Sequence, residues 1–110
     1  MEYLIEMALL RKSKTGLPVN IWIDEMGSAR NVKHNIPRLK IQNDYNSNRT
    51  DNTLSIEISE NPKILSGMQN IKDKDMNIIY DFIKRNLDLL LKHWNEEIDT
   101  DELKELLEYK

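Results

Sequence analysis

The spacing of the apolar residues changes once along this chain, and that change constrains the fold more than any other feature. Up to about residue 66, apolar residues lie in short runs that alternate with polar ones, the period of two that is typical of β-strands. From residue 72 onward they recur every three or four positions, as on one side of an α-helix. Strands followed by helices predict an α+β fold, in which a curved antiparallel sheet packs on a helix.

The first part of the chain predicts four or five strands. The segment 53–59 alternates most regularly, with Leu54, Ile56 and Ile58 pointing inward. In the segment 37–43, Leu39 and Ile41 point inward, while Arg38, Lys40 and Gln42 line the open face. The expected strands are 3–12, 19–24, 37–43, 53–59 and a short one at 63–65.

The second part predicts one long helix from about 72 to 96, with Asp73 as its N-cap. Its apolar stripe consists of Met76, Ile79, Ile83, Leu87, Leu90 and Trp94. Asp99 and Glu102 then have the spacing of a capping box, which predicts a short acidic C-terminal helix. Leu103, Leu106 and Leu107 form the apolar edge of that helix.

Length and composition narrow the class of protein. A chain of 110 residues is expected to form one domain, spanning 1–110. The absence of cysteine excludes disulfides and thiolate metal sites, and it favours a cytoplasmic location. No apolar stretch is long enough to cross a bilayer, so we expect no membrane partner. The abundance of Asn, Ile and Lys suits a bacterium of low G+C content or one of its phages.

Charge is distributed unevenly over a chain whose net charge is -3. Residues 10–43 hold seven Lys and Arg against two acids, whereas residues 93–110 hold seven acids against two lysines. Either region is a candidate contact surface or simply a solvated face. The candidate basic patch comprises Arg11, Lys12, Lys14, Arg30, Lys33, His34, Arg38 and Lys40. The candidate acidic C-terminal surface comprises Glu96, Glu97, Asp101, Glu105 and Glu108.

Catalytic and metal-binding patterns are missing from the sequence. Only His34 and His93 are available as imidazole ligands, and no carboxylates accompany them at ligand spacing. The serines lie outside any Gly-x-Ser-x-Gly elbow, and the three glycines form no phosphate-binding loop. We therefore expect no metal, no cofactor and no enzyme activity. His93, near a helix end, is better placed to interact with the helix dipole.

Two short motifs resemble a widespread family of small bacterial proteins known only as a domain of unknown function. Its members are often described as toxin–antitoxin or regulator-like. They typically carry His-Asn-Pro-Pro-His-Phe-His and then valine, where this chain has the segment 34–41, His-Asn-Ile-Pro-Arg-Leu-Lys-Ile. The segment 90–94, Leu-Leu-Lys-His-Trp, matches the family's helix end. Because Arg38 and Lys40 replace two family histidines, the resemblance implies anion contact there and no metal or acid–base role.

These features lead to two functional hypotheses. The first is a non-enzymatic binding protein of a bacterium, prophage or mobile element, such as an inhibitor of host defence or a toxin–antitoxin component. It would contact a protein partner through the acidic surface, or through residues 38–42 as an edge strand that extends the partner's sheet. The alternative is a nucleic-acid-binding regulator that uses the basic patch, provided that the first and third strands are neighbours.

Overall fold

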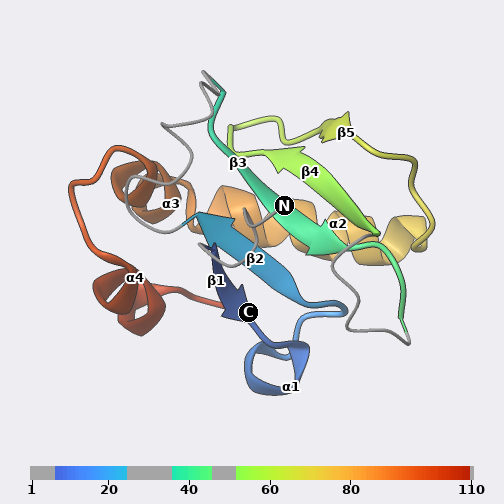
Figure 1. Ribbon diagram of the computed structural model, residues 1–110, viewed down its shortest axis with the longest axis horizontal. Helices are drawn as coiled ribbons and strands as arrows, with labels where there is room; N and C mark the ends of the chain where they lie inside the picture. Colours follow the sequence, from blue (N-terminus) through green and yellow to red (C-terminus); the bar gives the residue numbers. More distant parts are fainter. Residues whose placement is uncertain (1–6, 25–35, 46–51, 110) are drawn as a thin grey trace.

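The computed structural model describes residues 7–24, 36–45 and 52–109, and within these ranges the α+β prediction is confirmed. A five-stranded antiparallel sheet has the strand order β1-β2-β3-β4-β5, so each strand pairs with its neighbours in sequence (Figure 1). The strands are β1 (Met7–Leu10), β2 (Ile21–Asp24), β3 (Arg38–Gln42), β4 (Thr53–Glu57) and β5 (Ile64–Ser66).

The register of the sheet separates its two faces. Leu10, Ile21, Ile41 and Leu54 lie side by side across β1 to β4, and all belong to the main hydrophobic core. The adjacent row runs across all five strands on the opposite face and comprises Leu9, Trp22, Lys40, Ser55 and Ser66. The alternation read from the sequence is thus the alternation of the two faces.

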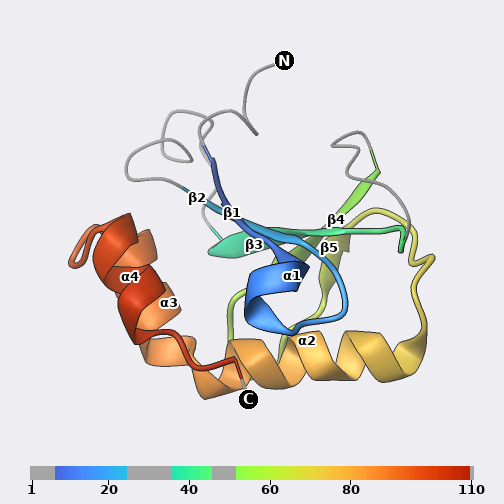
Figure 2. The ribbon, with the colours of Figure 1, turned by 90° about the horizontal axis from the view of Figure 1, so that it is seen from below.

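Helix α2 (Asp73–Arg85) covers the apolar face of the sheet, as Figure 2 shows. Met76, Ile79 and Ile83 are buried against the sheet as the stripe predicts. The helix begins differently from the prediction, because its N-cap is Lys72. The Asp73 carboxylate instead accepts a hydrogen bond from the side chain of Gln69 at 2.8 Å.

The single helix expected over 72–96 is wrong, because the helix is broken at Asn86. Helix α3 (Leu87–Trp94) starts immediately after this residue, whose backbone departs from helical geometry at φ -109° and ψ 20°. The buried side chain of Asn86 donates to the carbonyl oxygen of Phe82 and pairs with the main chain of Glu108. An asparagine that bonds to backbone groups in this way competes with the helical ladder.

Two shorter helices complete the fold. Helix α1 (Lys12–Thr15) lies between the first two strands, where the sequence analysis expected no helix, and it ends at Gly16, whose φ of 79° favours glycine. Helix α4 (Thr100–Leu106) follows Asp99, whose carboxylate accepts from the backbone N–H of Glu102 at 2.7 Å. The predicted N-cap is therefore confirmed.

Helices α3 and α4 pack together beyond one end of the sheet, next to β1 (Figures 1 and 2). Leu103 is fully buried in the core, and Leu107 is nearly so, whereas Leu106 is half exposed. None of the helices in the described ranges is long and apolar enough to cross a membrane.

Candidate functional site

Strand β3 lies at the centre of the sheet, so the prediction that residues 38–42 form an edge strand is wrong. β2 and β4 occupy its two edges, with Ile41 opposite Ile21 on one side and Leu54 on the other. Lys40 and Ile41 are therefore paired on both sides, so β3 does not offer a free edge to a partner's sheet. A pattern of alternating residues is the same in central and edge strands, which explains the error.

Arg38 and Lys40 do share the face of β3 that points away from α2. Lys40 lies between Trp22 and Ser55 in the register, and Arg38 lies opposite Glu57. Both cations are half-buried. Gln42 departs from the prediction, since it is buried and its side-chain oxygen accepts from the backbone N–H of Asn20 at 3.3 Å. The open face of β3 thus presents two cations, one of which lies opposite Glu57 of β4.

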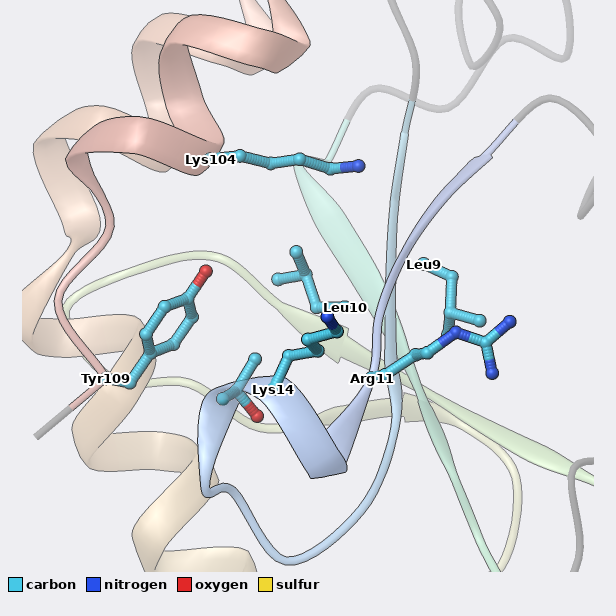
Figure 3. A pocket seen from close by; sticks show the side chains of 7 residues that line it. Leu9, Leu10, Arg11, Lys14, Lys104 and Tyr109 are labelled. Atoms are coloured by element: carbon cyan, nitrogen blue, oxygen red, sulfur yellow. The ribbon is translucent and has the colours of Figure 1, made fainter.

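The first and third strands are not neighbours, contrary to the condition for one merged basic patch. β2 separates them by two strand spacings, about 10 Å. Arg11 points to the same side of β1 as Leu9, and so toward the face that carries Lys40 (Figure 3). The ammonium group of Lys12 donates to the carbonyl oxygen of Tyr45 at 2.8 Å. Arg30, Lys33 and His34 lie outside the described residues.

Lys14 belongs to a different site, a pocket of about 290 Å³ between β1, α1 and the C-terminal segment. Lys104 of α4 and Tyr109 extend toward it from the other side (Figure 3). The sequence reasoning assigned neither residue to a site. Lys104 is a lone cation among the acids of α4, and this is the sequence feature that could have marked it as a site residue. The pocket is lined by Leu9, Leu10, Arg11, Lys14, Thr15, Lys104 and Tyr109.

All five residues of the predicted acidic surface are exposed. Glu96 and Glu97 lie in the connection between α3 and α4, where Glu96 adopts a φ of 64°. Asp101 and Glu105 are four residues apart on α4 and so share one side of this helix. Leu106, 50% exposed, borders these carboxylates.

Side-chain contacts hold α4 against the body of the protein. The Asn86 amide donates to the carbonyl oxygen of Glu108 at 2.7 Å and accepts from its N–H at 2.8 Å. His93 is buried, and its Nε2 lies 2.8 Å from the hydroxyl oxygen of Thr100. His93 therefore positions the start of α4, a role that its place in the sequence did not predict.

Tyr45 and Asp75 form a further polar contact, between the end of β3 and the first turn of α2. The Tyr45 hydroxyl donates to the carboxylate of Asp75 and accepts from the backbone N–H of Lys72. Burial and the contact with the Asp75 carboxylate raise the pKa of Tyr45. Within the described residues, no group of three or more His, Asp or Glu is arranged to hold a metal ion.

Comparison with models of known protein families, with curated proteins and with solved structures gave no match. The resemblance carried by the segments 34–41 and 90–94 therefore stays a prediction.

Proposed function

We propose that this chain is a non-enzymatic binding protein whose acidic C-terminal surface contacts a cationic protein partner. The observation that carries this proposal is the exposure of four carboxylates and their lack of ion pairs. Within the described residues, none of them forms a salt bridge, and all are exposed. They belong to Glu97, Asp101, Glu105 and Glu108.

The shape of α4 supports this assignment. Its buried side faces the core through Leu103, and its outer side carries Asp101 and Glu105. Leu106 adds an apolar contact at the border of the acidic side. Acidic side chains beside an exposed leucine offer a partner both electrostatic steering and apolar area to bury.

The anchoring of α4 supports it further. Asn86 and His93 fix the two ends of the helix through Glu108 and Thr100. A surface held in one conformation loses little conformational entropy when a partner binds, which favours affinity. Within this proposal, an inhibitor of host defence or a toxin–antitoxin component remains the expected biological setting, in the cytoplasm of a bacterium or its mobile elements.

The test is affinity capture from an extract of the source organism with three forms of the protein. The acidic variant carries Asp101→Asn, Glu105→Gln and Glu108→Gln. The control variant neutralises three exposed carboxylates elsewhere, with Glu60→Gln, Asp81→Asn and Asp88→Asn. We expect the wild type and the control to retain the same protein, and the acidic variant to lose it. Equal retention by all three forms, or no retention by the wild type, would contradict the proposal.

A second candidate function is a nucleic-acid-binding regulator, and one observation favours it. Arg38 and Lys40 share a face of the sheet on which Trp22 lies directly beside Lys40 in the register. Arg11 points to the same side. Of the predicted basic patch, these three cations share one side of the sheet, whereas Lys12 and Lys14 point elsewhere. The other three residues of the patch lie outside the described residues.

A further inference from the structure

The pocket beside β1 collects cationic groups from segments that are far apart in the sequence. Lys14 comes from α1, Lys104 from α4 and Tyr109 from the C-terminal segment, and all three side chains line the pocket (Figure 3). Arg11 contributes to the wall, while its guanidinium group points away from the other two cations. Among the described residues that line the pocket, none carries a carboxylate.

The polar groups of this pocket are donors. Each lysine ammonium has three N–H donors and no acceptor. Burial raises the pKa of the Tyr109 hydroxyl, so this group stays protonated and able to donate at neutral pH. Lys14 and Lys104 form no salt bridge with any described carboxylate. The described residues that line the pocket therefore give it a net positive charge.

The pocket is also held in shape by the fold around it. Tyr109 stacks on the buried ring of Phe82, with the ring centroids 5.9 Å apart and an angle of 4° between the planes. Glu108, its neighbour in sequence, is fixed by both bonds to Asn86. The buried Leu10 supplies an apolar wall opposite Tyr109.

We propose that this pocket binds a phosphate group, either as inorganic phosphate or as the monoester of a small organic molecule. Two ammonium groups match the double negative charge of a phosphate, and the tyrosine hydroxyl can bond to one of its oxygens. The volume of about 290 Å³ leaves room beside the phosphate for an organic substituent against Leu10. This site differs from the acidic surface proposed above, because neither Asp101 nor Glu105 lines the pocket.

Isothermal titration calorimetry tests the proposal with inorganic phosphate, phenyl phosphate and the uncharged analogue phenol. The variants are Lys14→Gln, Lys104→Gln and Tyr109→Phe, the last of which keeps the ring that stacks on Phe82. Lys63→Gln is the matched control, because it removes an exposed lysine that does not line the pocket. We expect phosphate-containing probes to bind the wild type, and each lysine variant to bind about tenfold more weakly or worse.

The probes separate the two sources of phosphate. Tighter binding of phenyl phosphate than of inorganic phosphate assigns the site to a monoester, and equal binding assigns it to the free ion. Binding of neither probe by the wild type overturns the proposal. So does a loss in Lys63→Gln equal to that in Lys14→Gln, or binding of phenol as tight as that of phenyl phosphate. The thermal midpoint of each variant, measured without ligand, establishes that it is folded.

Discussion

The side chain of Asn86 and the main chain of Glu108 are joined by two hydrogen bonds, one in each direction. The amide nitrogen donates to the carbonyl oxygen at 2.7 Å, and the amide oxygen accepts from the N–H at 2.8 Å. One buried residue thereby both ends α2 and holds the C-terminal segment. The proposed acidic surface and the phosphate pocket both depend on the position of that segment.

We expect Asn86→Ala to destabilise the protein by about 1–3 kcal/mol, because it leaves buried backbone groups without partners. The midpoint and slope of urea denaturation measure this change. Asn95→Ala is the matched control, since Asn95 is an exposed residue at the end of α3. Equal stability of the two variants would show that the contact with Glu108 contributes nothing.

Replacement by alanine should have different effects at Ile83 and Ile78, which both lie on α2. Ile83 is fully buried, and Ile83→Ala should cost about 2–5 kcal/mol because it leaves a cavity in the core. Ile78 is 45% exposed, so Ile78→Ala should cost much less. Urea denaturation of both variants measures the difference. An unchanged midpoint for Ile83→Ala would exclude α2 from the core.

Asp99→Ala should cost about 1 kcal/mol, because the carboxylate of this N-cap satisfies the backbone N–H of Glu102. Glu105→Ala serves as the control, since Glu105 lies on the exposed side of the same helix. Thermal denaturation followed by circular dichroism compares them. A loss in Glu105→Ala that matches the loss in Asp99→Ala would argue against a specific capping effect.

Alkaline pH should destabilise the protein through its partly buried tyrosines. Burial raises the pKa of Tyr109 above the ordinary value of 10.0, so folding favours the protonated hydroxyl. Its contribution is fully present below pH 10 and is lost as pH rises through the folded-state pKa. Tyr109→Phe should therefore lose less stability above pH 10 than the wild type.

Tyr109→Phe should still lose some stability at alkaline pH, because the pKa values of Tyr45 and Tyr80 are also raised. Denaturation midpoints measured at neutral and alkaline pH give the comparison. Identical pH dependence of wild type and Tyr109→Phe would contradict a raised pKa at Tyr109.

The second candidate function makes a prediction for Arg38 and Lys40. If they contact nucleic acid, changing both to Glu should abolish retention on heparin or duplex DNA, and retention of the wild type should weaken steeply with salt. Thermal stability should change little, because partly exposed charges contribute little to folding. Lys63→Glu with Lys74→Glu is the control double variant, at exposed positions away from this face. A wild type that is not retained at low salt rules out this function.

Much of the local structure follows directly from the sequence. Leu54, Ile56 and Ile58 alternate with polar residues and are all buried. The short strand β5 lies within one residue of its expected position, and Asp99 caps α4 as predicted. These features depend on residues a few positions apart, whose side-chain directions follow from the period of the strand or helix.

The tertiary structure decided the features that depend on distant residues. Asn86 looks like any polar residue within a helical pattern until Glu108 lies beside it, and only then does its amide break the helix. The central position of β3 required both neighbouring strands to be in place. Lys14 and Lys104, ninety positions apart in the sequence, line the same pocket. Periodicity reports which side of an element is buried, whereas long-range packing decides which elements meet there.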